Sequence, residues 1–371
     1  MIKNILITGA KGFIGSNLFV RLKLEKKYNI FCFDIENSEN DLEEYILKSD
    51  FIFHLAGVNR PKNENEFTKG NVNLTDKTIN ILENNNKNIP VIMTSSVHSG
   101  SDNPYGQTKQ QAENILLDYK SKGGKVLIYR LSNVFGKWCR PNYNSVVATF
   151  CYNIANGIDI QISNRKNEIN FIYIDDIIND LIEKINFDFS VLNKDFFYIK
   201  PEYKVSLGEV ADLLYGFHNI KQSLMVPDFS NDFVKKLHAT YLSYLPKDKF
   251  SSKAKLNEDE RGNLFELIKS RQFGQIFVST TKPGITRGNH YHHTKNEKFC
   301  VIRGAAEIKF RHILEDEVIT YKVSGDEPEI VDIPPGYTHS IINTGNSELI
   351  TLFWANEMFN QEKPDTFFEE V

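Results

Sequence analysis

The chain has 371 residues, which is long for one ordinary domain and suits two. It is 41% hydrophobic and 25% charged, as globular proteins are, and its net charge of −4 without a basic tract argues against nucleic-acid or membrane-surface binding. No apolar run approaches the roughly 20 residues that span a bilayer, and no signal peptide is visible. The four cysteines lack paired spacing, so we expect reduced thiols and a cytoplasmic protein.

Up to about residue 200, short apolar runs alternate with amphipathic stretches. The helix-like stretches include 14–26 and 109–120, and the strand-like runs are 4–8, 30–34, 51–55, 91–95 and 126–131. Strands separated by helical crossovers predict an α/β, Rossmann-type, doubly wound parallel sheet. Residues 201–244 have a helical pattern, with Ser206 as a cap and Glu209 following it.

A polar stretch, residues 245–263, precedes a region of different character. We place the boundary near residues 246–255, which predicts one domain over 1–246 and a second over 250–371. The second region contains β-rich runs joined by Gly, Pro and Asp turns, among them QIFVSTT, KFCVIRG, AEIKFRHI, VITYKV and LITLFWAN. These runs predict an all-β jelly roll.

The opening segment ILITGAKGFIG places Gly9, Gly12 and Gly15 between a predicted strand and a predicted helix. Glycine permits a tight turn and a close backbone approach, and the helix N-terminus can receive a pyrophosphate. A glycine pattern alone is a weak signal, but the strand, loop and helix context strengthens it. We therefore predict a dinucleotide site at this loop.

The segment YGQTK places Tyr105 and Lys109 four residues apart, on one face of a predicted helix. A nearby ammonium lowers the pKa of a phenol from about 10, which would make Tyr105 a usable acid near neutrality. Such pairs often arise by chance. This one follows a strand ending in TSS, so we predict a catalytic pair.

These segments resemble the extended short-chain dehydrogenase/reductase family of sugar-nucleotide enzymes over roughly residues 1–245. The resemblance also covers FIFHLAG, NVNLT, YRLSNVFG and FIYIDDI. It implies that Ser96 or Ser95, with Ser96 preferred, polarises the substrate carbonyl and that Tyr105 passes a proton to its oxygen. Lys109 would tune Tyr105 and hold the nicotinamide ribose. The predicted cofactor-binding residues are Gly9, Lys11, Gly12, Phe13, Ile14, Gly15, Asp34, Leu55, Ala56, Gly57 and Lys109.

Two features depart from that family's pattern, and a third bears on the choice of cofactor. Only VHSGSDNP separates Ser96 from Tyr105, and His98 stands where a tyrosine is common. Asp34 ends the second strand, where an acid normally binds the ribose 2′-hydroxyl of NADH, whereas Lys11 could meet the 2′-phosphate of NADPH. The resemblance of the whole chain, described below, favours NADPH.

Three histidines and a glutamate lie within eight consecutive residues of the second region. The spacing of His290, His292, Glu297 and the later His339, with its flanking Gly and Pro residues, resembles the two cupin motifs. His290 and His292 would share one face of a strand, while Glu297 and His339 from neighbouring strands complete the ligands of one divalent metal. Zinc suits these ligands, and iron, nickel and manganese fit too. The adjacent His293 should face outward.

A second resemblance suggests a different role for His290. RGNLFEL and TRGNHYHH are similar to segments of the deoxysugar 3,5-epimerases, which are also jelly rolls. Those enzymes use the corresponding histidine as a base and carry no metal. That interpretation leaves His292 and Glu297 without a role, so we favour the metal.

Over essentially its full length the chain resembles a family of bifunctional capsular-polysaccharide enzymes. The resemblance implies a zinc-containing homodimer whose cupin epimerises C3 of a UDP-2-acetamido-2,6-dideoxy-4-hexulose. The first domain would then reduce C4 with NADPH to UDP-2-acetamido-2,6-dideoxy-L-talose, on the path to UDP-N-acetyl-L-fucosamine. Alternatives are a monofunctional 4-ketosugar reductase with a structural, dimerising cupin, a non-catalytic nucleotide sensor, and a metal-dependent dioxygenase.

Overall fold

The computed structural model describes residues 2–61, 63–191 and 194–371. The chain divides into two compact units, Met1–Leu214 with Lys236–Leu245 and Tyr215–Lys235 with Pro246–Val371. The chain passes between them within α8 (Leu207–Ser223) and α9 (Asp232–Leu242). Our assignment of one activity to 1–246 and another to 250–371 therefore differs from these units at 215–235, and it stays a prediction.

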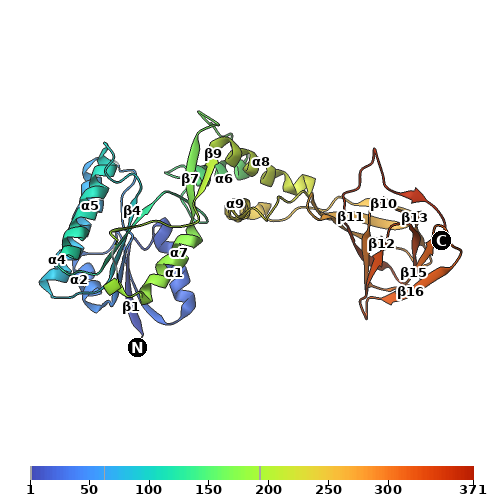
Figure 1. The fold of residues 1–371 in the computed structure, drawn as a ribbon, viewed down its shortest axis with the longest axis horizontal. Coiled ribbons are helices and arrows are strands. Elements are labelled where there is room, and N and C mark those ends of the chain that lie inside the picture. The colour runs from blue at the N-terminus through green and yellow to red at the C-terminus, as the bar shows by residue number, and fades with distance from the viewer. Residues whose placement is uncertain (1, 62, 192–193) are drawn as a thin grey trace. The chain divides into compact units, whose positions relative to one another are not determined.

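A parallel sheet of six strands lies at the centre of the first unit, in the order β2-β1-β3-β4-β5-β8. Its strands β1 and β4 are labelled in Figure 1. Its strands are β1 (Lys3–Thr8), β2 (Tyr28–Phe33), β3 (Phe51–His54), β4 (Val91–Ser96), β5 (Val126–Leu131) and β8 (Phe196–Phe197). From β1 the chain runs first to β2 on one side and later to β3 on the other. A crevice is expected outside the carboxyl ends of the strands at such a switch point.

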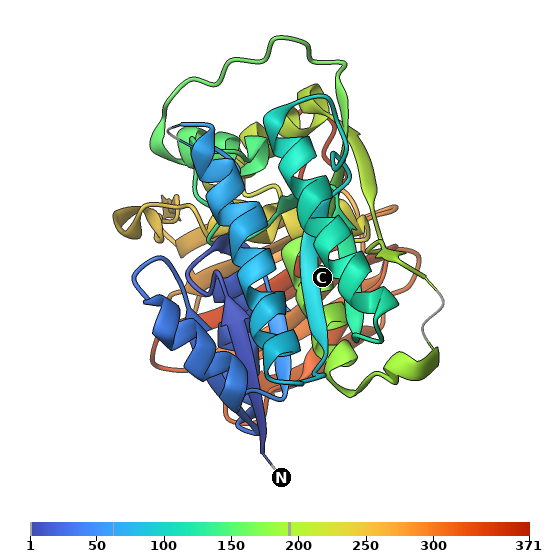
Figure 2. The ribbon, with the colours of Figure 1, turned by 90° about the vertical axis from the view of Figure 1, so that its left-hand side faces the viewer.

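Helices cover both faces of this sheet. Helices α1 (Phe13–Glu25) and α7 (Ile174–Glu183) pack on one face, where they meet Ile5 and Ile7 of β1. Leu6 points to the other face, which is covered by α2 (Glu39–Lys48), α4 (Leu74–Asn84) and α5 (Pro104–Ser121), with α4 beside α5 (Figure 2). Burial on both faces explains the continuous apolar runs of these strands and confirms the predicted doubly wound sheet.

A smaller sheet completes the first unit. It consists of β6 (Asn133–Phe135), β7 (Glu168–Tyr173) and β9 (Tyr203–Ser206). The strand β9 corrects the prediction of helix from residue 201 onward, because all four of its residues pair with β7. The helix begins at Leu207, and the Ser206 hydroxyl accepts a hydrogen bond of 3.2 Å from the Glu209 N–H, as the predicted cap requires. The remaining helices among the described residues are α3 (Asn65–Phe67), η1 (Thr68–Asn73), α6 (Val146–Asn156), η2 (Lys184–Asn186), η3 (Phe189–Val191) and η4 (Lys247–Lys249). None of the described helices is both long and apolar enough to cross a membrane.

The second unit is built from two antiparallel sheets, in the orders β10-β11-β12-β19-β14-β17 and β16-β15-β18-β13-β20. Apolar side chains from both sheets form one core, including Phe299 and Phe353 from the first and Ile308 and Ile341 from the second. This arrangement confirms the predicted all-β, cupin-type jelly roll. The strands are β10 (Asn257–Asp259), β11 (Gly262–Ser270), β12 (Gly274–Thr281), β13 (Thr286–Tyr291), β14 (Glu297–Arg303), β15 (Ala305–His312), β16 (Val318–Ser324), β17 (Ile330–Ile333), β18 (Tyr337–Asn343), β19 (Leu349–Ala355) and β20 (Phe367–Phe368).

An earlier part of the chain also joins this second unit. The N–H of Lys269 in β11 donates to the carbonyl of Leu224 at 2.8 Å, and the Val226 N–H donates to the carbonyl of Lys269 at 2.9 Å. These bonds attach residues 224–226 to the edge of the jelly roll.

Candidate active sites

The loop between β1 and α1 depends on its glycines. Gly9 has a φ of +69°, and a Cβ there would lie 2.7 Å from the backbone of Ala56. A Cβ at Gly15 would lie 2.1 Å from the carbonyl oxygen of Gly9, so the helix and the loop are packed too closely for any side chain. Gly12 is the N-cap of α1 and has no side chain to occupy the first-turn N–H groups. The N-terminus of α1 therefore stays open toward a phosphate.

A cavity of about 560 Å³ borders this loop and the carboxyl ends of β1, β3 and β4. Two predicted cofactor residues lie outside its described lining: Ala56 packs against Gly9, and Asp34 accepts a hydrogen bond of 2.7 Å from the Lys11 N–H. The other predicted residues line one continuous surface, which also includes the predicted catalytic residues. They are Gly9, Lys11, Gly12, Phe13, Ile14, Gly15, Leu55, Gly57, Ser96, Tyr105 and Lys109.

The side chain of Lys11 forms an ion pair at the edge of this cavity. Its ammonium lies 2.7 Å from the carboxylate of Glu36, and both side chains are more than half exposed. The hydrogen bond to Glu36 raises the pKa of Lys11. Exposed pairs of this kind are weak and are readily exchanged for another anion, such as a phosphate.

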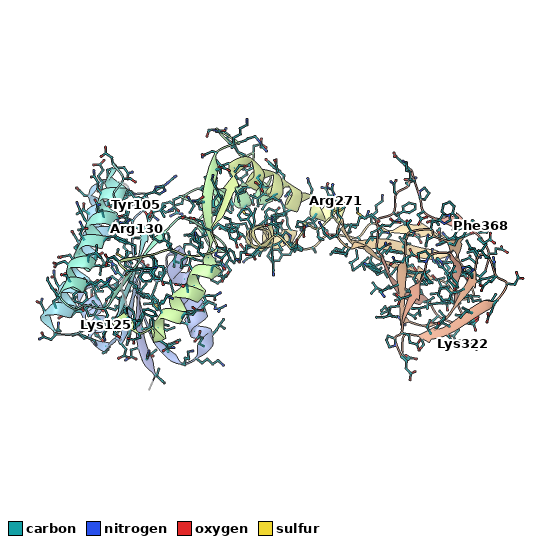
Figure 3. The ribbon with its side chains drawn as sticks, in the orientation of Figure 1. Tyr105, Lys125, Arg130, Arg271, Lys322 and Phe368 are labelled. Atoms are coloured by element: carbon teal, nitrogen blue, oxygen red, sulfur yellow. The ribbon has the colours of Figure 1, made fainter. Side chains whose placement is uncertain are left out.

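Tyr105 and Lys109 lie one turn apart on α5, which starts earlier than the predicted helix. Asn103 caps this helix by accepting a hydrogen bond of 2.8 Å from the Gly106 N–H, and Pro104 occupies its first turn. Lys109 is buried, and its ammonium donates to the carbonyl of Thr94 at 3.4 Å. Both predicted catalytic side chains therefore reach the cavity from one helix face, with Tyr105 on the first unit in Figure 3.

The electrostatics of this pair differ from the sequence-based expectation. Burial raises the pKa of Tyr105, and a hydrogen bond with Ser96 only partly opposes that rise. Burial also lowers the pKa of Lys109 to about 8, while the charge of Glu113 pulls in the opposite direction. The predicted lowering of the tyrosine pKa by the lysine is therefore wrong for this structure, because desolvation dominates both groups.

The two candidate serines at the end of β4 have different partners. The Ser95 hydroxyl donates to Glu113 at 2.6 Å, and Glu113 also accepts two hydrogen bonds from Arg130, at 3.1 and 2.6 Å. The Ser96 hydroxyl instead accepts from the His98 N–H at 3.1 Å and shares a hydrogen bond with Tyr105. Ser95 thus belongs to a buried ionic network, while Ser96 adjoins the predicted proton donor.

A further group of residues on the same cavity was not predicted from the sequence. Arg60, Trp138, Arg140 and Tyr143 line it, and the Arg140 guanidinium lies 5.2 Å from the ring centroid of Tyr143. Three of the four come from the segment KWCRPNYNS, whose cations and aromatic residues in a loop were the signal that could have identified it. Two guanidinium groups suit an anionic part of a ligand, such as a diphosphate.

The four predicted metal ligands come together in the second unit. His290 in β13 is paired in register with His339 in β18, and the ligand atoms of all four residues lie within 4.8 Å of one another. Two details differ from prediction. His292 lies just beyond the end of β13, and Glu297 begins β14 in the opposite sheet, not a strand next to β18. The cluster therefore joins the two sheets. The neighbouring His293 is exposed, as predicted.

Two buried nitrogens in this cluster have no hydrogen-bond partner among the described residues, Nε2 of His292 and Nε2 of His339. They lie 3.5 and 3.6 Å from Oε2 of Glu297. Buried polar atoms are normally hydrogen-bonded, so two unpartnered nitrogens facing one carboxylate oxygen indicate a place for a cation. Three imidazoles and a carboxylate are a donor set for zinc and for other first-row divalent metals. The residues present fit one such metal.

The charge states of the cluster agree with metal binding. Burial lowers the pKa of His290 to about 4, and the neighbouring His339 and His292 contribute in the same direction. Burial by itself would raise the pKa of Glu297, but His292, His339 and the charge of Lys295 outweigh it and hold this pKa below its usual range. At neutral pH the site therefore presents a neutral His290 and an ionised Glu297, the forms that bind metals.

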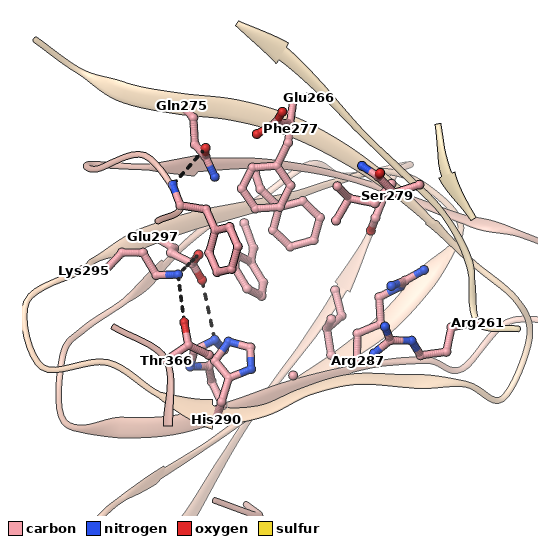
Figure 4. A pocket seen from close by; sticks show the side chains of 18 of the residues that line it. Arg261, Glu266, Gln275, Phe277, Ser279, Arg287, His290, Lys295, Glu297 and Thr366 are labelled. Atoms are coloured by element: carbon pink, nitrogen blue, oxygen red, sulfur yellow. Dashed lines mark hydrogen bonds and ion pairs between the residues drawn. The ribbon is translucent and has the colours of Figure 1, made fainter. Parts of the chain in front are cut away.

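A cavity of about 850 Å³ lies against the cluster and is rich in cations. Arg261 and Arg287 lie on one side of it in Figure 4, and His290 and Glu297 lie on the other. The Lys295 ammonium projects between Oε1 of Glu297, at 3.5 Å, and the Thr366 hydroxyl, at 3.4 Å. Lys255 and Lys269 also line the cavity, so it suits an anionic ligand. None of these five cations was predicted to have a role from the sequence.

Comparisons with known proteins match two separate parts of the chain. Residues 5–183 match the NAD dependent epimerase/dehydratase family, and residues 257–367 match the polysaccharide biosynthesis C-terminal domain. The UDP-2-acetamido-2,6-beta-L-arabino-hexul-4-ose reductase of Pseudomonas aeruginosa is 43% identical over 364 residues, covering 98% of this chain and 97% of the relative.

Two solved structures resemble the structure of this chain. The capsular polysaccharide assembling protein CapF from Staphylococcus aureus has a TM-score of 0.92 and 47% identity, covering 99% of this chain and all of the other. The UDP-glucuronic acid 4-epimerase from Bacillus cereus, in complex with NAD, has a TM-score of 0.55 and 18% identity over 67% of this chain and all of the other, which shows a shared fold alone. Because the likeness to the reductase and to CapF extends over nearly the full length of each, this chain belongs to the CapF family.

Proposed function

We propose that this chain is a bifunctional sugar-nucleotide enzyme of capsular polysaccharide synthesis. Its second unit epimerises C3 of a UDP-2-acetamido-2,6-dideoxy-4-hexulose. Its first unit reduces C4 with NADPH and yields UDP-2-acetamido-2,6-dideoxy-L-talose, on the path to UDP-N-acetyl-L-fucosamine. The observation that carries this proposal is the full-length identity of 43% with a reductase named for a UDP-linked hexul-4-ose. The two separate ligand cavities support two activities.

In the reduction, the catalytic residues act on the C4 carbonyl. Bound NADPH supplies a hydride to C4. Ser96 donates a hydrogen bond to the carbonyl oxygen, and Tyr105 delivers the proton that this oxygen takes up. Lys109 holds the nicotinamide ribose. In agreement with this role, its ammonium lies beside Gly57, 2.9 Å from the position that a Cβ at this glycine would occupy. Arg60 and Arg140 neutralise the diphosphate of the substrate.

We prefer NADPH to NADH because of the charges at the glycine loop. Lys11 is exposed and can exchange Glu36 for a 2′-phosphate. The carboxylate of Asp34 already accepts hydrogen bonds from the N–H groups of Lys11 and Ile35, at 2.7 and 2.9 Å, so it is less available to a ribose hydroxyl. Lys11→Ala should raise KM for NADPH about tenfold and leave KM for NADH unchanged. An equal change in the two KM values would favour NADH as the cofactor instead.

In the epimerisation, the 4-keto group makes the C3 proton acidic. Removing that proton gives an enolate, and returning it on the opposite face inverts C3 without a redox change. A metal held by His290, His292, Glu297 and His339 would supply a Lewis acid for the developing oxyanion. Lys295 adds a positive charge at the same place. Hydride addition at C4 then removes the ketone that made C3 labile, so the reduction preserves the new configuration.

We further propose that the metal is zinc and that the enzyme is a cytoplasmic homodimer. The ligand set supports zinc, and the absence of a disulfide among the described cysteines supports a reducing compartment. Light scattering would test the dimer, and elemental analysis would test the metal.

A monofunctional reductase with a structural cupin is the principal alternative. The name of the Pseudomonas aeruginosa relative specifies only reduction, and buried metal clusters are often structural. A metal-free epimerase with His290 as base is a second alternative, because this imidazole is neutral and lines the cavity. The unpartnered nitrogens of His292 and His339 argue against a metal-free epimerase.

The deciding experiment is proton exchange at C3. The chain is incubated in deuterium oxide with the 4-hexulose, with and without NADPH, beside a sample without enzyme. We expect enzyme-dependent deuterium at C3 without NADPH, loss of this exchange on removal of the metal, and NADPH oxidation only in the complete mixture. Reduction without any C3 exchange would support the monofunctional reductase. Exchange by protein that contains no metal would support the metal-free epimerase.

A further inference from the structure

We propose that Asp365 is a positioning residue for the metal cluster, through both its backbone carbonyl and its side chain. It would fix the ring of His292 and the segment 293–295 that connects His292 to Glu297. The inference rests on the proposed metal site. It concerns a residue that lies 73 positions after His292 in the sequence and carries no motif of its own.

The carbonyl of Asp365 selects one form of His292. Nδ1 of the imidazole contacts this carbonyl oxygen, which can only accept a hydrogen bond, so Nδ1 carries the proton. The lone pair then resides on Nε2, the buried nitrogen that faces Oε2 of Glu297. Metal-binding histidines are commonly oriented in this way by an acceptor on their second nitrogen.

The carboxylate of Asp365 holds the following segment. One oxygen accepts from the His293 N–H at 3.0 Å, and the other accepts from the N–H groups of Thr294 and Lys295, both at 2.8 Å. The Thr294 hydroxyl adds a fourth bond, at 3.0 Å. Three consecutive backbone N–H groups therefore converge on one side chain, and this shapes the turn that carries the chain from His292 to Glu297.

Asp365 is itself held in place by the residues that follow it. Phe367 pairs with Tyr291 in register and stacks on its ring, with the ring centroids 5.4 Å apart. Arg311 donates to the carboxylate of Glu369 at 2.9 Å. None of the residues 365–371 belongs to the apolar core of the jelly roll, and Phe368 is 77% exposed (Figure 3). The segment therefore stabilises the metal site more than the core, and the unit should fold without it.

The test compares three variants of the full chain with the wild type. Asp365→Ala removes the carboxylate and keeps the carbonyl, and a truncation after Pro364 removes both. Glu362→Ala deletes an exposed carboxylate three residues away and serves as the matched control. Zinc affinity is measured by competition with a chromophoric chelator. Hydrogen exchange of the amides of residues 293–295 is measured on the metal-free proteins, and thermal unfolding monitors folding.

We expect zinc affinity to fall about 10- to 100-fold in Asp365→Ala, and further in the truncated chain, with no change in Glu362→Ala. Exchange at residues 293–295 should become faster in both Asp365 variants. Lower thermal stability with unchanged zinc affinity would show a merely structural role and overturn the inference. Slow exchange in Asp365→Ala would also overturn it. A wild type that takes up no zinc, while its variants still show faster exchange, would overturn the metal proposal and leave only the ordering of the turn.

Discussion

Replacing Ser95 by alanine should lower stability, whereas replacing Ser96 by alanine should lower activity, although the two serines are adjacent in β4. Ser95→Ala removes a hydrogen bond of 2.6 Å to Glu113, whose side chain is 1% exposed. Hydrogen bonds to charged groups contribute about 1.5–3 kcal/mol to stability, and Glu113 keeps both bonds from Arg130. We therefore expect Ser95→Ala to lower the free energy of unfolding by about that amount and to leave kcat within a few-fold of wild type.

Ser96→Ala should instead act on the reduction. It removes the hydroxyl that bonds Tyr105 and, in our proposal, the donor to the C4 carbonyl oxygen. Loss of one such donor typically lowers kcat by about 10²–10³-fold, or roughly 3–4 kcal/mol of transition-state stabilisation. The protein should keep its stability, because the only other bond that the hydroxyl makes among the described residues is with the exposed loop at His98.

Two measurements separate these outcomes. Denaturant unfolding gives the stability of each variant, and the loss of NADPH absorbance with the 4-hexulose gives kcat. Ser95→Thr serves as a control, because it retains a hydroxyl for Glu113. Loss of most activity in Ser95→Ala at unchanged stability, together with an active Ser96→Ala, would refute these assignments, since the catalytic hydroxyl would then be the one bonded to Glu113.

Four further results are expected. Tyr105→Phe should slow NADPH oxidation by about 10²–10⁴-fold but leave C3 exchange intact, and loss of both in a folded variant would refute separate sites. Gly12→Val should fold, because φ at Gly12 is −70° and an added Cβ would make one tight contact, at 3.1 Å from the Gly9 carbonyl oxygen, which a small shift of the loop relieves; fluorescence titration should nevertheless show no NADPH binding. The pKa of Lys109, lowered by burial from 10.5 to about 8, places a penalty on folding below pH 8 that disappears as pH rises to 10.5. Wild type should therefore gain about 3 kcal/mol relative to Lys109→Met over that window, and parallel stability curves would contradict this. Elemental analysis should find one metal per wild-type chain and none in His339→Ala, and a metal-free wild type would favour the metal-free epimerase.

Elements and motifs that depend on neighbouring residues could be predicted from the amino-acid sequence. The continuous apolar run of β1 and the glycines that follow it are local features, so the parallel sheet and the glycine loop could be predicted. The same holds for the one-turn spacing of Tyr105 and Lys109. The four predicted metal ligands could be proposed because their spacing resembles a known motif, whereas their placement on two different sheets could not be predicted.

The partners of these residues, in contrast, follow from the folded chain alone. Sequence spacing could not show that Ser95 bonds Glu113, or that Asp365 contacts His292, because the chain brings these pairs together from 18 and 73 positions apart. It also could not show that residues 224–226 join β11, since a backbone hydrogen bond leaves no mark on side-chain pattern. Desolvation of Lys109 and Tyr105 depends on everything packed around them, so the direction of their pKa shifts follows from the fold and not from their spacing.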